Sequence, residues 1–289
     1  MTGSTNVGSA LAHGAQRLAA SAASAAGAAG AAATAALDAA LLLAHILGTT
    51  RARLLAHSEV ALEPTAAERY AALIARRVAG EPLAYLTGRR EFWSLELAVT
   101  PAVLVPRPET ELLVERALAL CPASATGAVD LGTGSGAVAL ALAAERPRWR
   151  ITATDVSAAA LAVARANARR LGLAVEFREG DWFAPLAGRR FDLAVSNPPY
   201  VAAGDPALAA GALAHEPRLA LTPGADALAC LRAIVRAAPH HLEPGGWLLL
   251  EHGATQGAAL RAELVAAGFA HVRSHRDLAG HERMTEGQR

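Results

Sequence analysis

The sequence predicts an α/β protein with two domains: a parallel sheet covered by helices, and a small N-terminal helical domain joined to it by a β-hairpin connector. From about residue 109 onward, short apolar segments alternate with longer segments of helical periodicity, which is typical of a parallel sheet covered on both faces. Before residue 86, the recognisable periodicity is helical. Hydrophobic residues make up 53% of the 289 residues and charged residues 18%, a composition that excludes a disordered chain.

The part of the chain before the sheet divides into three predicted segments. Residues 1–33 are rich in Gly, Ala, Ser and Thr with little periodicity, so we expect a flexible leader. Residues 34–85 should form the helical domain, with one helix that ends at Gly48 and a second over residues 65–78. Residues 86–108 alternate in hydrophobicity and then carry three prolines, which predicts a hairpin followed by a stiff connector.

Residues 109–289 form the predicted sheet domain. Ligands in parallel α/β sheets bind beyond the carboxyl ends of the strands, so a site is expected there. Strands are expected at residues 128–131, 150–155, 174–178, 191–196, 246–252 and 269–274, and helices at residues 136–145, 158–171, 226–240 and 258–267.

A glycine-rich turn follows the first predicted strand of this domain. Glycine permits a sharp turn and a close backbone approach to a ligand, and the N-terminus of the following helix offers unpaired N–H groups. Such a turn can also serve packing alone, but we interpret this one as a site for a nucleoside-type cofactor. It reads Asp130-Leu131-Gly132-Thr133-Gly134-Ser135-Gly136.

Two further positions fit the same cofactor. Asp155 ends the next strand, where a carboxylate can accept both hydroxyls of a ribose, although an isolated Asp there can also cap the helix that opens near Ser157. Beside the glycine turn, the ribose interpretation is preferred. Asp181 and Trp182 follow the third strand, and Trp182 offers either a flat wall for a purine ring or a buried packing contact. The sequence leaves both of these open.

The segment Ser196-Asn197-Pro198-Pro199-Tyr200 follows the fourth strand directly. Two consecutive prolines cannot continue a hydrogen-bonded ladder, and they hold the chain in a rigid extended turn. We expect the Asn197 side chain and the Pro198 carbonyl to face outward and accept the two hydrogens of a planar NH₂ group, with Tyr200 packed against its plane. An amide nitrogen is a poor nucleophile, so a site that holds it in line with an electrophilic carbon acts by orientation and charge stabilisation.

These motifs, in this order, resemble the class I S-adenosylmethionine-dependent methyltransferases, and more specifically the peptide chain release factor glutamine N5-methyltransferases of the HemK/PrmC type. The resemblance runs from about residue 34 to about residue 285, and it implies a Rossmann-like sheet domain behind the helical domain and hairpin. NPPY alone is shared with amino-methyltransferases of DNA, whereas the PRPET connector together with REFW is far more specific. The closer resemblance is carried by AYLTGRREFW, VPRPETELL, SNPPYV, HEPRLAL and LLLEHG.

The resemblance also implies a role for each matching residue. S-adenosyl-L-methionine is the implied cofactor, and the glutamine of a Gly-Gly-Gln loop in class 1 release factors is the implied methyl acceptor. No general base is evident. The implied cofactor-binding residues are Gly132, Thr133, Gly134, Ser135, Gly136, Asp155, Trp182 and Asn197. The implied substrate-binding residues are Asn197, Pro198, Pro199, Tyr200, Leu104 and Arg107, of which Asn197, Pro198 and Tyr200 are the implied catalytic residues.

Other functions compete with this one. The related methyltransferases that act on a ribosomal-protein glutamine share NPPY, and a DNA or RNA amino-methyltransferase is a more distant alternative. The latter normally carries a basic recognition domain, which a formal net charge of +1 does not favour. A third alternative is a nucleotide-binding module without catalytic activity, but such a module would not account for the NPPY segment. We therefore expect a cytoplasmic monomer, without membrane or direct nucleic-acid partners, whose N-terminal helices dock a release factor.

Three smaller expectations concern the C-terminal part. Glu251 and His252 follow an apolar strand and can border the pocket, where structural support is favoured over a catalytic role. His271 and His275 stand four apart, but they fall in and just beyond a predicted strand, so we expect no metal site. The chain stops soon after residues 282–285, where the family continues into a strand that ends in aromatic residues, so a short final edge strand is expected.

Overall fold

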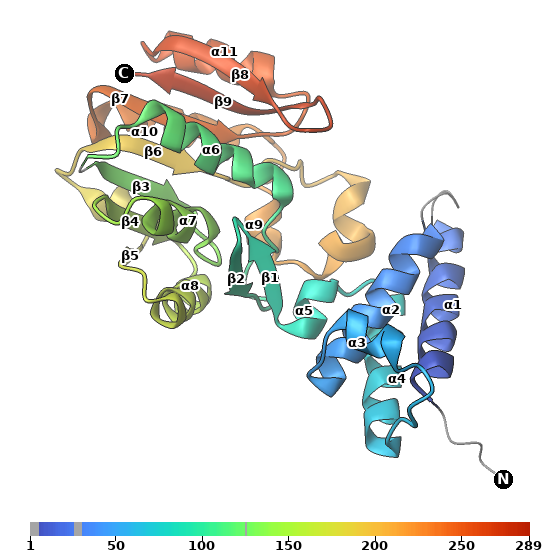
Figure 1. The fold of residues 1–289 in the computed structure, drawn as a ribbon. Helices are drawn as coiled ribbons and strands as arrows, with labels where there is room; N and C mark the ends of the chain where they lie inside the picture. Colours follow the sequence, from blue (N-terminus) through green and yellow to red (C-terminus); the bar gives the residue numbers. More distant parts are fainter. Residues whose placement is uncertain (1–5, 26–30, 125) are drawn as a thin grey trace. The chain divides into compact units, whose positions relative to one another are not determined.

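The computed structural model describes residues 6–25, 31–124 and 126–289. The chain forms two compact units: a helical unit of the residues up to 88 with residues 210–215, and a sheet unit of residues 89–209 with 216–289. Figure 1 shows the two units along the chain, with the N-terminal helices in blue and the sheet in green to red. The predicted architecture, a helical N-terminal region and an α/β sheet, is confirmed. Within the described residues, no helix is long and apolar enough to cross a membrane.

The helical unit is held together by apolar faces that meet around Leu42, Leu43 and Ile74, which are buried. Pro64 is the first residue of its second predicted helix, a position where the fixed φ of proline suits the helix and its missing N–H costs nothing. Arg77 Nε donates to Asp38 Oδ2 at 2.8 Å across this unit. Its helices are α1 (Val7–Ala25), α2 (Ala31–Leu47), α3 (Arg51–Ala56), α4 (Pro64–Val78) and α5 (Leu83–Thr87).

Helix α1 covers much of the segment for which a flexible leader is expected. The structure differs from that expectation over residues 7–25, where α1 contacts α2 and α4 and buries Val7 and Leu18. Residues 1–5 and 26–30 of the expected leader lie outside the described residues. Alanine is the strongest helix former, so a segment with few large apolar residues still folds as a helix once it packs against neighbours.

The sheet unit contains a seven-stranded sheet in the order β5-β4-β3-β6-β7-β9-β8, which Figure 1 shows edge to edge in colours from yellow-green to red. The five strands from β5 to β7 are parallel, and β9 is antiparallel to both β7 and β8. The strands are β3 (Gly127–Leu131), β4 (Arg150–Asp155), β5 (Glu176–Glu179), β6 (Phe191–Ser196), β7 (Leu242–Glu251), β8 (Ala270–Arg276) and β9 (Glu282–Gln288).

Helices cover both faces of this sheet, because neighbouring residues of each strand point to opposite faces. Ala128 and Leu193 belong to the core that also contains α6 and α7, whereas Val129 and Ala194 belong to the core that contains α10 and α11. The helices of this unit are α6 (Glu111–Leu120), α7 (Ala137–Glu145), α8 (Ala158–Leu171), the short α9 (Arg218–Leu221), α10 (Ala229–His241) and α11 (Gly257–Ala266).

The last strand, β9, is not at an edge of the sheet. It lies between β7 and β8, so that β5 and β8 are the edge strands, and it is seven residues long. Its register with β7 runs from Trp247 opposite Gln288 to Glu251 opposite Met284. The expectation of a short final edge strand is therefore wrong. The chain passes through β8 first and then returns between β8 and β7, an order of pairing that residues 282–289 alone do not reveal.

The predicted hairpin is present as β1 (Arg89–Phe92) and β2 (Leu95–Ala98). Trp93 and Ser94 form its turn with φ values of 50° and 58°, and two left-handed residues are what a two-residue hairpin loop of type I′ requires. Phe92 and Leu97 are buried in the core of α6 and α7. The hairpin is thus part of the sheet unit, and the connector behind it leads through a 3₁₀ turn (Pro108–Thr110) into α6.

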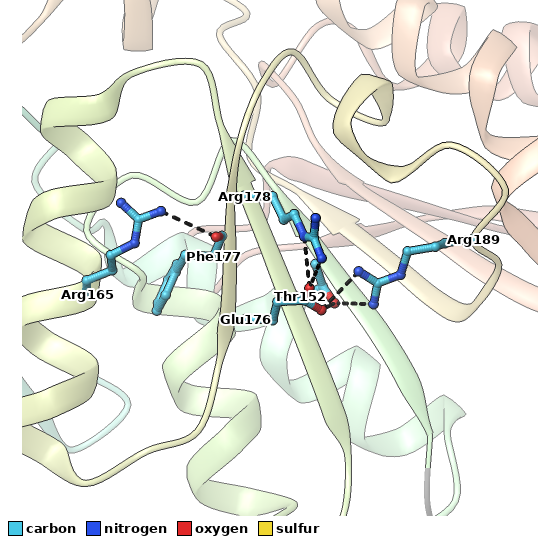
Figure 2. A network of polar contacts seen from close by, with 6 residues as sticks. All are labelled: Thr152, Arg165, Glu176, Phe177, Arg178 and Arg189. Carbon is cyan, nitrogen blue, oxygen red and sulfur yellow. Dashed lines mark hydrogen bonds and ion pairs between the residues drawn. The ribbon is translucent and has the colours of Figure 1, made fainter.

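A polar network joins the amino-terminal halves of β4 and β5 and the loop before β6, as Figure 2 shows. Glu176 is the first residue of β5, and its carboxylate accepts hydrogen bonds from Arg178 Nε at 2.8 Å and from Arg189 Nη1 at 2.9 Å. Arg189 also donates to Thr152 Oγ1 on β4 at 3.0 Å. Hydrogen bonds from Arg178, assisted by Arg189, lower the pKa of Glu176. The network links the edge strand β5 to β4. It lies away from the carboxyl ends of the strands.

Candidate active site

A cavity of about 380 Å³ lies in the sheet unit beyond the carboxyl ends of β3, β4 and β6. Two neighbours of β3, namely β4 and β6, lie on its opposite sides, so the cavity is at the point where strand order reverses and α/β sheets bind ligands. Its lining comes from the segments that follow β3, β4, β5 and β6, from residues 102–110 of the connector and from residues 217–223.

The glycine turn lines the cavity. Gly132, Gly134 and Gly136 have φ values of 72°, 55° and 87°, a left-handed conformation that other residues adopt only with strain. A Cβ atom on Gly134 would meet nothing within 4 Å, whereas one on Gly136 would lie 3.0 Å from Leu140 Cδ1 and 3.3 Å from Ala164 Cβ. Gly134 therefore leaves its backbone open toward a ligand, and Gly136 lets α7 approach α8.

Asp130 stabilises this turn through hydrogen bonds. Its Oδ2 accepts the Thr133 hydroxyl at 2.6 Å and the Ala139 N–H at 3.2 Å, so it fixes both the turn and the first residues of α7. Burial raises the pKa of Asp130 to about 6, and these two hydrogen bonds oppose that rise. The carboxyl is thus a positioning group, a role that the sequence pattern did not single out.

Asp155 lies beside the turn, at the end of β4. Its Oδ2 accepts the Gly134 N–H and its Oδ1 the Ser157 N–H, both at 2.9 Å. The helix cap is supplied by Ser157, whose hydroxyl accepts the Ala160 N–H at 3.1 Å. Each oxygen of Asp155 keeps lone pairs for further donors, so the carboxylate can bind paired hydroxyls. Burial raises its pKa, and the two backbone hydrogen bonds oppose the rise.

Trp182 lines the same cavity, with Val156 and Asp181. Its backbone has a φ of 43°, and its carbonyl accepts the Thr154 hydroxyl at 2.9 Å. A Cβ atom on Gly132 would lie 3.1 Å from Trp182 Cζ3, so the indole packs directly over the first glycine of the turn. The side chain therefore packs against the turn and also lines the cavity, so the packing contact is present and the role as a wall for a purine ring stays a prediction.

The NPPY segment follows β6, whose last residue, Ser196, pairs with Leu131 just before the glycine turn. Asn197 and Pro199 line the cavity, whereas Pro198 and Tyr200 are not among its lining residues. Pro198 is buried, and Tyr200 is directed away toward β7, where its hydroxyl donates to Glu251 Oε1 at 3.1 Å. Asn197 Nδ2 donates to Thr110 Oγ1 at 3.1 Å. This leaves Asn197 Oδ1 as the acceptor that this side chain can offer to the cavity.

Glu251 of the LLLEHG motif and the nearby Gln256 both contact Tyr200. Besides the bond from its hydroxyl to Glu251, its carbonyl accepts Gln256 Nε2 at 2.9 Å. Burial raises the pKa of Glu251 to about 7, against the lowering effect of the Thr110 and Tyr200 hydroxyls. Glu251 is thereby placed as the structural support that its position predicts. Gln256 lies outside every motif, and the sequence carries no signal for it.

The connector forms another wall, because Leu104 and Arg107 both line the cavity. Glu216, from the HEPRLAL segment, holds this wall in place: its side chain is fully buried, forms an ion pair with Arg107, and accepts the Val105 N–H at 3.1 Å. A buried carboxylate needs such a partner, since an unpaired charge in the interior is costly. Glu216 is a residue within a recognised motif whose task only the fold reveals.

Asn167 of α8 ties the hairpin to the glycine turn. Its Nδ2 donates to the carbonyls of Ala98 and Ser135 at 3.0 Å each, and its Oδ1 accepts the Ala98 N–H at 2.7 Å. The side chain is fully buried, so its hydrogen bonds are made within the protein: three join these two segments, and Oδ1 also accepts from Arg170 Nη2 at 3.5 Å. No sequence pattern points to Asn167, because a single Asn on a helix is most often exposed.

His271 and His275 are not neighbours of the cavity. His271 has a φ of 51° next to Trp247, while His275 lies 3.1 Å from Glu286 Oε2. Among the described residues, no group of three or more His, Cys, Asp or Glu has the arrangement of a metal site.

The sequence is similar to that of known proteins over most of its length. Residues 9–88 match the PrmC N-terminal domain family, and residues 108–226 match the Methyltransferase small domain family. A release factor glutamine methyltransferase of Burkholderia pseudomallei is 52% identical over 261 residues, which cover 88% of this chain and 92% of that relative. The chain belongs to the release factor glutamine methyltransferase family.

A second relative agrees with this membership, and a solved structure shares the fold. A release factor glutamine methyltransferase of Pseudomonas aeruginosa is 52% identical over 253 residues, or 87% of this chain and 92% of the relative. A crystal structure of a methyltransferase from Pyrococcus furiosus matches 74% of this chain and 96% of its own with a TM-score of 0.53 at 20% identity, which supports the fold. The expected family is therefore confirmed.

Proposed function

We propose that this protein transfers a methyl group from S-adenosyl-L-methionine to the side-chain amide nitrogen, N5, of the glutamine in the Gly-Gly-Gln motif of a class 1 peptide chain release factor. One observation carries the proposal: the proline-stiffened Asn197 turn and the glycine turn line the same cavity. Family membership, from relatives 52% identical over nearly the whole chain, supports the substrate class.

The residues of the cavity fit the cofactor. Its volume of about 380 Å³ lies within the range of small-molecule sites. Asp155 would accept the ribose hydroxyls, and the open backbone at Gly134 would face the methionine end. Trp182 and the half-exposed Val156 would flank the adenine. When bound, S-adenosyl-L-methionine supplies an electrophilic methyl group on its sulfonium.

The NPPY segment would supply acceptors for the substrate amide. Asn197 Oδ1 would accept one N–H of the glutamine carboxamide. We propose the carbonyl of Pro198 as the acceptor of the other, although Pro198 is buried and is not among the residues that line the cavity. Holding both hydrogens fixes the nitrogen in line with the methyl carbon and stabilises the positive charge that develops on it. The new N–C bond forms as the S–C bond breaks, and the nitrogen then releases one proton to water. A strong general base is unnecessary, because the alkylated amide nitrogen is acidic.

The remaining parts of the chain have tasks in this proposal. Leu104 and Arg107 would form the wall that meets the glutamine-bearing loop, with Arg107 neutralised by Glu216. The N-terminal helices would dock the body of the release factor. We place the enzyme in the cytoplasm, where translation occurs, as a monomer.

A labelling experiment tests the proposal. The full chain is incubated with S-adenosylmethionine tritiated on the methyl group and, separately, with a purified class 1 release factor, ribosomal proteins and DNA. We expect label on the release factor, and its loss when the Gly-Gly-Gln glutamine is replaced by alanine. Label on the ribosomal proteins or DNA instead would overturn the substrate assignment while leaving the methyltransferase assignment intact.

A further inference from the structure

A buried polar chain runs behind the cavity from Asn197 to β7. Asn197 Nδ2 donates to Thr110 Oγ1 at 3.1 Å, and Tyr200 donates through its hydroxyl to Glu251 Oε1 at 3.1 Å. Thr110 and Glu251 are only 4% and 2% exposed. Such groups are shielded from water, so each depends on protein partners for its hydrogen bonds.

The second oxygen of Glu251 leaves this chain incomplete. Among the described residues, Oε2 is buried and has no hydrogen-bond partner at bonding geometry. The Thr110 hydroxyl interacts with the same carboxyl, and because its oxygen already accepts from Asn197, its single hydrogen is free to be donated. Donation of this hydrogen to the carboxylate would therefore satisfy both groups.

This arrangement determines which way the amide of Asn197 faces. While Thr110 donates to a carboxylate, its oxygen can only accept, so it must be met by the NH₂ of Asn197. Asn197 Oδ1 then faces the cavity, where it can accept a hydrogen. If the amide were rotated by half a turn, its NH₂ would confront the NH₂ of a substrate, and two donors cannot bond to each other.

We propose that Glu251 and Thr110 are positioning residues for methyl transfer: ionised Glu251 orients the Thr110 hydroxyl, which presents Asn197 Oδ1 to the substrate amide. The proposal deepens the proposed function and rests on it, because the amide so held is that of the substrate glutamine. Glu251 has no place among the residues that line the cavity, so it acts through Thr110 and Asn197.

A dependence on pH follows from the surroundings of Glu251. Burial raises its pKa to about 7; the Thr110 and Tyr200 hydroxyls and Arg283 of β9 lower it, and Glu109 before α6 raises it. As the pH falls through this value, the carboxyl gains a proton and can itself donate to Thr110. The hydroxyl hydrogen is then released toward Asn197, and the amide is no longer held with Oδ1 in the cavity. We expect kcat to fall on the acidic side of about pH 7.

Paired variants of Thr110 provide the main test. In the full chain, Thr110→Val keeps the shape and removes the hydroxyl, while Thr110→Ser keeps the hydroxyl and removes a methyl group. Thr110→Val should lower kcat on a release factor by about 10- to 100-fold, and Thr110→Ser should stay within about threefold of the unaltered enzyme. Calorimetry should show weaker binding of a Gly-Gly-Gln peptide to Thr110→Val in the presence of S-adenosylhomocysteine, with the affinity for S-adenosylhomocysteine unchanged.

Glu251→Gln tests the role of charge. Its amide can donate to Thr110 at every pH, so the variant should be slow throughout and lose the acidic limb of the kcat profile. Glu216→Gln is the matched control, since Glu216 is an equally buried carboxylate that contacts Arg107 and Val105 instead; the limb should persist in it. If Glu251→Gln does not fold, the two Thr110 variants still decide the question.

Two results would overturn the inference: equal kcat values for Thr110→Val and Thr110→Ser, or an acidic limb that survives in Glu251→Gln. Both presuppose an unaltered enzyme that methylates the release factor. Failure of that enzyme to transfer methyl groups at any pH would contradict the proposed function instead, so the two failures are distinguishable.

Discussion

Asn197 is the residue on which transfer should depend most directly. Its Nδ2 donates to Thr110 Oγ1, which leaves its oxygen as the acceptor that we propose for the substrate amide. Asn197→Ala removes that acceptor, so kcat should fall by about 100- to 1,000-fold, the scale seen when one preorganised hydrogen-bonding group is removed from an active site. Binding of S-adenosylmethionine, measured by calorimetry, should change little. A variant with near-normal turnover would refute the assignment of Asn197 as the amide acceptor.

Asp155 should decide cofactor affinity rather than the chemical step. It is the carboxylate beside the glycine turn, and its loss would remove the acceptor that we propose for two ribose hydroxyls. Hydrogen bonds to a charged group are worth about 1.5–3 kcal/mol each, so Asp155→Ala should weaken S-adenosylmethionine binding at least about 10- to 100-fold in equilibrium dialysis. Asp226→Ala is the control, because the side chain of Asp226 is 54% exposed. The affinity of this variant for S-adenosylmethionine should equal that of the unaltered protein. Equal affinities in both variants would remove Asp155 from the site.

The approach of α7 to α8 depends on one glycine. Gly136 and Gly172 both have left-handed φ values, 87° and 67°, but an added Cβ would crowd Leu140 and Ala164 only at Gly136. Gly172→Ala should therefore cost about 1–2 kcal/mol of unfolding free energy for the backbone alone. Gly136→Ala should cost about 1–3 kcal/mol more, because a close contact is overpacked. Urea denaturation of both variants measures the difference, and equal losses would show that close packing at Gly136 does not matter.

At the scale of the whole molecule, cofactor binding should stabilise one unit of the chain. The cavity lies entirely within the sheet unit. A ligand at 100 times its Kd adds about 2.7 kcal/mol to the stability of the state that binds it. For a unit of this size, that amounts to a rise in Tm of about 5–10 °C. Scanning calorimetry with S-adenosylhomocysteine should show this shift in the sheet transition, and an unshifted transition would argue against the cofactor site.

Local patterns were sufficient for most of the sheet unit. The predicted strands at 150–155 and 191–196 and the helix at 158–171 coincide with β4, β6 and α8, because short apolar strands and capped helices are encoded by neighbouring residues. The glycine turn and the NPPY turn were located for the same reason. Glycine and proline restrict the backbone at their own positions, and strand ends in a parallel sheet share one edge.

The partnerships between distant segments could not be inferred from such patterns. Asn167, Glu216 and Glu251 are single polar residues, and their importance comes from complete burial against segments far away in the chain. The insertion of β9 between β7 and β8, and the packing of α1, likewise depend on contacts between remote residues. A sequence pattern reflects the local conformational preference of each residue. Burial of a polar group or a strand edge is costly unless the group is paired, and its partner is brought near only when the whole chain folds.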